Sequence, residues 1–429
     1  MAAALLAGTL ALAQFPDLSL PQFARHKLFD QYQRWLPRER TAAPVTIVDI
    51  DEASLRQVGQ WPWPRDRLAE LLRAIGENRP LAIGVDVYMP ERDQTSPRAL
   101  ARRLPAQDTQ LRALLGRLPD HDAELASAIR STPTVLGAAG FDHEALTVSR
   151  SLRAIPVRTV GGDALAHVRQ YPFVLASLPE FQAAAAGQAL LSVDRQGALV
   201  RRIPLAMSVG DTVLPSLAVE VLRVAAGAPF AELEVGAFGV RELRVADLAV
   251  PTQSDASVWL HFGRADPARY VSAAAVLDRR VPAEAFESKV VLVGLSGYGL
   301  ADSQVTPLGE HVPGVEFQAQ LVESLLERDL LLRPYWMPWL ETGLLLAGGL
   351  LLIWAVPKLP ARLATLLAGS IYVVLLAGGV AMFHWGGLLL DAATTFGALN
   401  IVLGSLLGDR KSTRLNSSHG YISYAVFCL

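Results

Sequence analysis

Acidic residues follow two predicted strands, at the point where each strand ends. Asp49 and Asp51 close the apolar run VTIVDID, and Asp86 closes the apolar part of LAIGVDVY. We predict that these strands are adjacent in an open α/β sheet, which binds ligands beyond the carboxyl ends of its strands. Asp302, which follows a predicted strand at 290–295, can approach the same edge. Clustered carboxylates are ligands for Mg²⁺ or Ca²⁺, so the pattern predicts a ligand or cation site, with the metal undetermined.

The same side chains also have a structural interpretation, and it is the one we favour. Asp51 can cap the turn that follows it, and Asp49 and Asp86 can pair with Arg65 or with backbone amides. Arg65 completes the set of candidate ligand-binding residues. The sequence contains no G-x-S-x-G elbow, H-E-x-x-H pair, Walker motif or kinase signature. We therefore assign no catalytic residue and no cofactor.

Alternating strands and helices must position these residues. A strand at 45–51, a helix that begins at Pro64 and a strand at 81–88 form a βαβ unit. The later elements are a helix at 120–130, a strand at 134–139, an antiparallel hairpin of 189–194 and 199–208, a helix at 215–226, strands at 258–262 and 290–295, and an amphipathic helix at 315–330. The predicted fold class is α/β, a mainly parallel sheet covered by helices, with an antiparallel hairpin. Residues 92–118 contain six arginines and no apolar strand, so we expect a solvated surface insertion.

The composition separates an ordinary α/β stretch from a membrane-like one. Hydrophobic residues make up 51% of the 429 residues and charged residues only 19%, against about 25% charged residues in soluble domains. The excess lies at 336–408, where three apolar runs predict three transmembrane helices, the third interrupted only by Asp391. The alternative is a set of helices buried in a large soluble protein. The Gly-Gly pairs at 348–349 and 378–379 argue against it, because small residues suit helix packing in membranes.

The charges of the loops predict the orientation. Lys358 and Arg362 lie between the first and second apolar runs, and the loop before the third run has no basic residue. The positive-inside rule places the first loop and the C-terminus in the cytoplasm, and therefore residues 16–333 outside it. We interpret residues 1–15 as the remnant of a signal anchor, with a cleaved signal peptide as the alternative. Residues 411–429 do not continue the preceding pattern and resemble translated adapter or vector sequence.

Charge and cysteine content exclude several classes of protein. The net charge of −2 is unlike that of a strongly basic nucleic-acid-binding protein, so we expect no nucleic-acid partner. The single cysteine, Cys428, lies in the terminal segment. A disulfide scaffold and a cysteine-based zinc site are therefore excluded.

Between residues 45 and 333 the chain resembles the type-2 CHASE domain, an extracellular sensor that is attached to cyclases and kinases in bacteria. The matching pieces are VDID at 48–51 with SL at 54–55, GQWPWPR at 59–65, IGVD at 83–86, DAELASA at 122–128, DRQGALVRRIP at 194–204, PSLA at 215–218, KVVLVGLSGYGLADSQVTP at 289–307 and PGVE at 313–316. Three transmembrane helices after the domain are also typical of this family. The chain departs from the family at both ends, so no catalytic activity is carried over.

The resemblance implies the sensory part of a bacterial transmembrane receptor in the inner membrane. An unknown small-molecule or envelope stimulus would bind outside the cytoplasm, and the signal would pass to a cytoplasmic cyclase or kinase domain that we do not find in this chain. We expect the helix at 315–330, with Phe317, Leu321 and Leu325, to be the mechanical link, and Arg333 to mark the break before the first span. Membrane lipid and a second copy of the intact receptor are the expected partners.

Two other functions are possible from the residues alone. The first is a metal-dependent hydrolase on the outer face that uses Asp49, Asp51 and Asp86. The second is part of a transporter, which the apolar runs disfavour because they carry no paired ionisable residues that could line a path.

Overall fold

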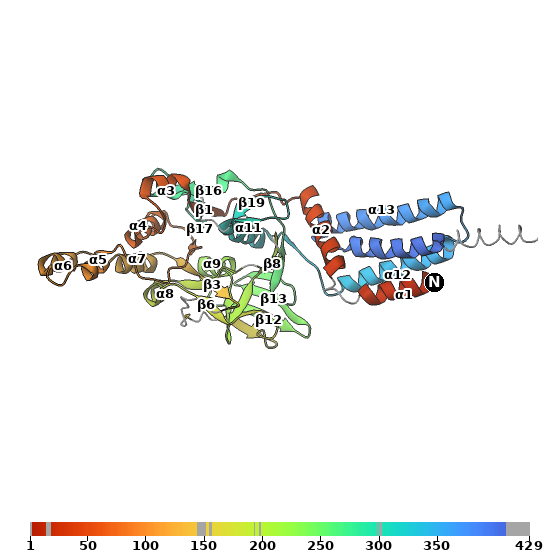
Figure 1. The fold of residues 1–429 in the computed structure, drawn as a ribbon, viewed down its shortest axis with the longest axis horizontal. Coiled ribbons are helices and arrows are strands. Elements are labelled where there is room, and N and C mark those ends of the chain that lie inside the picture. The colour runs from red at the N-terminus through yellow and green to blue at the C-terminus, as the bar shows by residue number, and fades with distance from the viewer. Residues whose placement is uncertain are drawn as a thin grey trace, which may run out of the picture. The chain divides into compact units, whose positions relative to one another are not determined.

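The structure, a computed structural model, describes residues 2–13, 19–143, 152–153, 157–192, 194–196, 199–297, 299 and 303–408. These residues belong to two compact units. The α/β unit comprises Pro37–Leu330, and the helical unit comprises Met1–Leu36 with Leu331–Leu429. Both are drawn in Figure 1. Asp302 and the segment 411–429 lie outside the described residues.

A seven-stranded sheet forms the centre of the α/β unit. Its strands are β1 (Val45–Ile50), β2 (Ala82–Val85), β3 (Thr134–Phe141), β6 (Phe173–Leu175), β7 (Gly187–Leu190), β16 (Tyr270–Ser272) and β17 (Val290–Leu295). Five of them run parallel in the order β16-β1-β17-β2-β3, and β3 also pairs with parallel β7 and antiparallel β6. The prediction that β1 and β2 are adjacent is therefore wrong, because β17 lies between them.

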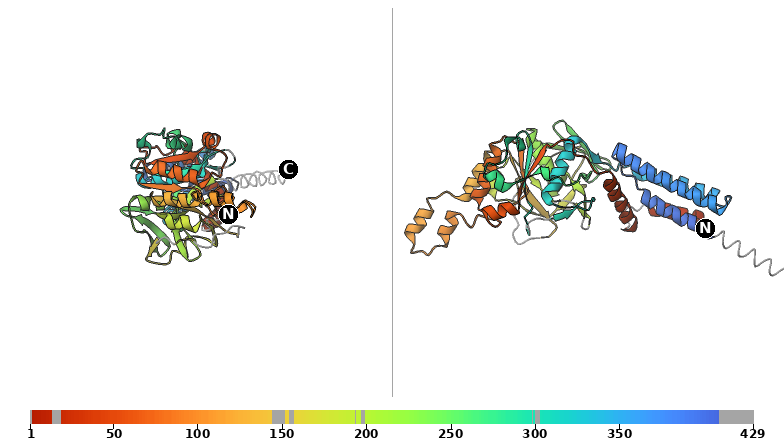
Figure 2. Two further views of the ribbon diagram at one scale, coloured as in Figure 1. Left: turned by 90° about the vertical axis from the view of Figure 1, so that its left-hand side faces the viewer. Right: turned by 90° about the horizontal axis from the view of Figure 1, so that it is seen from above.

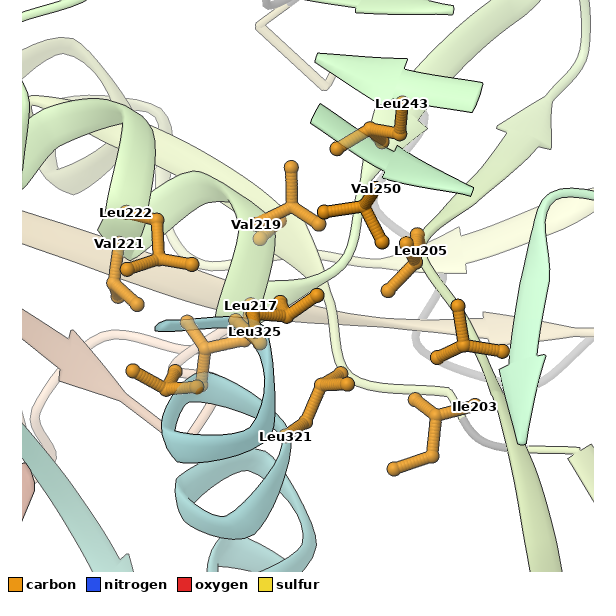
Figure 3. Packing of buried hydrophobic residues seen from close by; sticks show 14 of the residues in the cluster. Ile203, Leu205, Leu217, Val219, Val221, Leu222, Leu243, Val250, Leu321 and Leu325 are labelled. Atoms are coloured by element: carbon orange, nitrogen blue, oxygen red, sulfur yellow. The ribbon is translucent and has the colours of Figure 1, made fainter. Parts of the chain in front are cut away.

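Helices cover both faces of this sheet. One face carries α3 (Glu52–Val58), α4 (Arg65–Gly76), α7 (His121–Arg130), α8 (Pro179–Ala184) and α10 (Ala273–Leu277), and the other carries α9 (Leu217–Ala225) and α11 (Gly314–Glu327). Alternate residues of β1 divide between them: Val48 and Ile50 pack with the first group, and Val45 and Ile47 with the second. Figure 3 shows the second core, where Leu217 of α9 lies near Leu325 of α11.

Smaller mixed sheets complete the α/β unit, so the parallel character holds for the central sheet and not for all strands. Their strands are β4 (Val157–Val160), β5 (Arg169–Tyr171), β8 (Asp194–Gln196), β9 (Leu199–Pro204), β10 (Ala206–Val209), β11 (Thr212–Pro215), β12 (Ala231–Gly236), β13 (Gly239–Val245), β14 (Leu248–Pro251), β15 (Ser257–Leu260), β18 (Ser303–Val305), β19 (His311–Pro313) and the short β20 (Leu330–Leu331). The predicted hairpin exists as β8 and β9. The first strand of the hairpin was expected at 189–194, and this is wrong. Residues 187–190 instead form β7, which pairs with β3 in the central sheet.

The expected surface insertion consists of two short helices, α5 (Pro97–Arg103) and α6 (Thr109–Leu115). No side chain of α6 is buried, as expected for a solvated segment. Single-turn 3₁₀ helices lie at Pro267–Arg269 and Ala283–Ala285.

The helical unit contains α1 (Ala2–Ala13), α2 (Ser19–Trp35), α12 (Met337–Ala355), α13 (Ala361–Gly386) and a further helix at 392–408. Of the described helices, α12 and α13 are long and apolar enough to cross a membrane. The helix at 392–408 is shorter than the ~20 residues that a span takes, so the third transmembrane helix stays a prediction. The third run also begins later than expected, because α13 continues to Gly386.

Small residues let the helices of this unit approach one another closely. A Cβ atom at Gly349 would lie 2.5 Å from Leu6 of α1, and one at Gly379 would overlap the hydroxyl group of Tyr32. At Gly378 a Cβ atom would meet nothing within 4 Å. Only one member of the second Gly-Gly pair is therefore needed for close packing.

Asp391 lies at the start of the helix at 392–408. Its carboxylate accepts hydrogen bonds from the Thr394 amide (3.0 Å) and hydroxyl (2.6 Å), which caps the helix. The acid therefore lies at a helix end rather than in the middle of a span, where its cost would be greatest.

Candidate functional site

A cavity of about 660 Å³ lies at the carboxyl edge of the central sheet, beyond the ends of β2, β3, β7 and β17. This volume falls in the range of sites for small molecules. The walls are both polar and apolar. They are formed by Trp61, Asp86, Val87, Tyr88, Ala139, Gly140, Phe141, Asp142, His143, Tyr171, Leu191, Ser192, Leu295, Gln304, Gly314, Val315, Phe317 and Gln318.

Asp86 contributes to this cavity, as its place after β2 suggests. Its backbone amide donates to the carbonyl oxygen of Val293 in β17 (2.9 Å), which fixes the end of β2 against the neighbouring strand. The cavity therefore lies at the edge of the sheet where the carboxyl-edge rule expects a ligand, and the role of Asp86 in binding one stays a prediction. Of the aspartates that we singled out, only Asp86 lines it among the described residues.

Asp51 has a structural role. It caps α3, and its Oδ1 accepts hydrogen bonds from the Ser54 amide (2.8 Å), the Ser54 hydroxyl (2.6 Å) and the Ser272 hydroxyl (2.9 Å). Ser54 in turn accepts a hydrogen bond from the amide of Ala274 (2.9 Å). The residue therefore ties the start of α3 to the end of β16.

Asp49 is buried at the end of β1 with an unusual environment for a carboxylate. Its Oδ2 accepts a hydrogen bond from the Ser296 hydroxyl (2.5 Å), while its Oδ1 has no partner among the described residues. Burial raises the pKa of Asp49 to about 6, opposed by the hydrogen bond from Ser296 and assisted by the nearby charge of Asp51.

Arg65 lies at the start of α4, and its contacts are with other acids. Its backbone amide donates to Oδ2 of Asp93 (2.9 Å). Burial lowers the pKa of Arg65, and the charges of Asp93 and Asp122 oppose this shift. The expected pairing of Arg65 with Asp49 or Asp86 is not among its contacts in the described part of the chain.

The predicted cation site included Asp302, which lies outside the described residues, so only Asp49, Asp51 and Asp86 can be compared. Within the described residues, no group of three or more His, Cys, Asp or Glu side chains is placed to hold a metal ion. The reason is topological, because β17 separates the strand that carries Asp49 from the strand that carries Asp86.

The mixed cavity wall includes the first turn of α11. Gly314, Val315, Phe317 and Gln318 all line it. Gln318 is fixed by accepting a hydrogen bond from the Ala218 amide of α9 (3.2 Å). One helix thus forms part of the cavity and also belongs to the buried core.

The apolar side of α11 packs as the sequence predicted. Phe317 contacts Phe262 edge to face, with 5.6 Å between the ring centroids. Leu321 and Leu325 are fully buried against α9 and its neighbours, as Figure 3 shows. The helix is nevertheless not a surface helix, because its polar side is also buried.

That polar side carries an ion-pair network that the sequence analysis missed. Glu323, which is completely buried, accepts hydrogen bonds from Arg38 (2.9 Å), Arg40 (3.0 Å) and Arg269 (2.9 and 3.1 Å). Arg269 also pairs with Glu316. Burial works to lower the pKa of Arg269, but the facing carboxylates outweigh it and raise the pKa.

The network reaches the end of α11 as well. Glu327 pairs with Arg38 (2.7 Å) and accepts a hydrogen bond from the Thr41 hydroxyl (3.0 Å). A signal for the network was present in the sequence, since positions 316, 320, 323 and 327 share one helix face. These residues are Glu, Gln, Glu and Glu. A polar helix face of this kind usually faces water, so the pattern alone does not indicate a buried ion-pair network.

Arg333 belongs to the helical unit and has partners there. Its guanidinium group donates to both carboxylate oxygens of Glu341 (2.7 and 2.8 Å) and to the carbonyl oxygen of Leu389 (3.1 Å). The helix that we expected to reach residue 330 ends at Glu327, and Arg328 adopts a left-handed conformation with φ of 56°. The connection between α11 and α12 therefore comprises residues 328–336, and Arg333 lies within it.

The chain combines an α/β unit that contains a cavity with apolar helices. The model of the CHASE2 domain family matches residues 2–356, and the chain belongs to that family. CHASE2 domains are extracellular sensory domains rather than catalytic ones. The match extends beyond the resembling motifs at 45–333 and includes α1, α2 and α12. Comparisons with curated proteins and with solved structures give no significant match.

Proposed function

We propose that this chain is the signal-input part of a receptor in the bacterial inner membrane. The α/β unit lies outside the cytoplasm and binds a small-molecule or envelope stimulus in the cavity at the carboxyl edge. The helices carry the signal across the membrane to a cytoplasmic output domain. One observation carries the proposal: the first turn of α11 forms part of the cavity wall, and along the chain only nine residues, 328–336, separate the end of α11 from the start of α12.

A stimulus can signal only if it binds two arrangements of the protein with different affinities. A ligand in the cavity contacts Phe317 and Gln318 at one end of α11, and Glu327 lies at the other end. A helix of fourteen residues spans about 21 Å and moves as one body when it is packed on all sides. A shift at the cavity therefore reaches the end of the α/β unit.

The ion-pair network supports this path. Arg38 and Thr41 belong to the segment by which the chain enters the α/β unit, and α11 belongs to the segment by which it leaves. Glu327 joins the two. Movement of α11 is thus shared by both connections to the helices. The hydrolase alternative has no comparable support, because Asp51 is occupied in capping α3.

A receptor fusion tests the proposal. The chain is joined after residue 408 to an adenylate cyclase catalytic domain, and cyclic AMP production is measured in membranes. Leu191→Trp fills part of the cavity and should change the output, whereas Val160→Trp, on an exposed strand, should not. A Gly-Gly insertion after Arg328 should abolish the effect of L191W, because it disconnects α11 from α12.

A second insertion serves as the control. Gly-Gly placed beside Phe238, in an exposed turn, should leave the effect of L191W intact. Two results would show that this path does not carry the signal. One is cyclic AMP production that L191W does not change, and the other is an effect of L191W that persists after the insertion behind Arg328.

A further inference from the structure

The insertion of residues 92–118, here called the arm, exposes an unusual number of apolar side chains. It projects from the α/β unit (Figures 1 and 2). Leu100, Leu111, Leu114 and Leu118 are 42%, 47%, 60% and 53% exposed. None of them belongs to a hydrophobic core cluster of the described residues. Exposed leucines gathered in one short segment are typical of an interaction surface.

The arm is also strongly basic. It contains six arginines and two aspartates, a net charge of +4. Arg92, Arg98 and Arg103 have partners near the base of the arm. In the part of the chain that the structure describes, the side chains of Arg102, Arg112 and Arg117 have none.

The rest of the α/β unit, here called the body, has the opposite charge. Residues 37–91 and 119–330 contain 24 basic and 34 acidic residues, a net charge of −10. Arm and body are therefore complementary in charge. Two arms would repel each other, which disfavours arm-to-arm contact.

The arm is presented from a fixed base. Asp93, which is buried, accepts hydrogen bonds from the Arg65 amide (2.9 Å) and the Thr95 amide (2.7 Å), and its carboxylate lies 3.0 Å from Nδ1 of His121. Asp93 also donates its own amide to Asp122 (3.2 Å). A fixed base lowers the entropy that association would cost.

We propose that the arm is a self-association surface, which docks on the acidic body of a second copy of this chain. In a two-fold symmetric dimer each arm contacts the body of the other copy, so the contact forms twice. The leucines are removed from water, and the unpaired arginines meet carboxylates. This step rests on the proposed function: in the receptor proposed above both copies lie in one membrane, where their effective concentration is high.

Charge reversal tests the surface in the full chain, purified in detergent. The mass of the protein component is measured by light scattering in about 50 mM and about 500 mM NaCl. The higher salt concentration screens the attraction between the charges of the arm and those of the body. The wild type should be a dimer at low salt and dissociate at high salt. R102E/R112E/R117E should be a monomer, with half the mass. L111S/L114S/L118S should also be a monomer.

A matched variant controls for the change in net charge. R56E/R241E/R280E reverses three arginines of the body with exposed side chains, and it should remain a dimer. Amide hydrogen exchange of α11 reports whether each variant is folded, and it should not change, because the arm contributes to no core cluster.

Three results would overturn the proposal. One is a wild type that is monomeric at low salt. Another is a dimer that survives reversal of the arm, since the helical unit would then hold it. The third is a monomeric wild type that floats with phosphatidylglycerol vesicles and loses this binding on reversal of the arm, which would make the arm a lipid-binding surface.

Discussion

Glu323→Gln should loosen α11 strongly, because Glu323 is the centre of the buried ion-pair network. The carboxylate is completely buried and receives hydrogen bonds from Arg38, Arg40 and Arg269. Glutamine has the same shape but no charge, and its amide group would point donor protons at the donor protons of an arginine. Removing one partner of a buried ion pair costs about 3–5 kcal/mol.

The assay is amide hydrogen exchange of the full chain in detergent, read by mass spectrometry on peptides from α11. Each 1.4 kcal/mol is a factor of ten in an opening equilibrium. The slowest amides of α11 should therefore exchange roughly 100- to 4000-fold faster in E323Q than in the wild type.

Glu287→Gln is the matched control. Glu287 forms an ion pair with Arg79 (2.6 Å), but both side chains are well exposed. An exposed pair contributes about 0–1 kcal/mol, so E287Q should change exchange in α11 by less than about tenfold. Equal rates for the two variants would refute the view that the network holds α11 in place.

Two further predictions concern stability. Burial raises the pKa of Asp49 to about 6, above the ~3.9 of an exposed aspartate, so the stability that this group contributes is complete below about pH 4 and is lost as the pH rises through 6. The midpoint temperature of thermal unfolding of Asp49→Asn should therefore rise relative to that of the wild type as the pH increases from 4.5 to 8. A difference between the two proteins that does not change with pH would contradict a raised pKa of Asp49. Gly379→Ala should lower the stability of the helical unit by about 1–3 kcal/mol because its methyl group would overlap Tyr32. Gly378→Ala, where no atom lies within 4 Å, should not lower it, and equal losses would argue against close packing at Gly379.

The strands β1, β2, β3 and β17 and the helices α4, α7, α9 and α11 could be predicted from the sequence, because each has a local pattern. The sheet formed by β4, β12, β13 and β14 was not predicted. Buried parallel strands such as VVLVGL are continuous apolar runs, and α4 repeats leucines at helical spacing. The order of the strands could not be predicted. β17 pairs with both β1 and β2, and the residues of β17 carry no mark that identifies their partners.

The candidate site was predictable only in outline. The carboxyl-edge rule located the cavity and Asp86, since it depends on strand direction alone. The rule could not show that Asp86 lines the cavity whereas Asp49 and Asp51 do not. Asp51 and Asp49 are hydrogen-bonded to Ser272 and Ser296, which are distant from them in the sequence. The polar face of an amphipathic helix ordinarily faces water, and only the tertiary contacts of α11 show that arginines cover its polar face.

The position of β17 also has a consequence for how the protein is made. β1 and β2 lie on either side of a place that is filled only when residues 290–295 arrive, long after both strands have left the ribosome. Pairings so distant in sequence are slow to form. Until then, the edges of β1 and β2 keep unpaired backbone N–H and C=O groups beside apolar side chains, and they can pair wrongly or aggregate. Chaperones should therefore bind the growing chain until β17 emerges, and a fragment that ends before residue 290 should not fold.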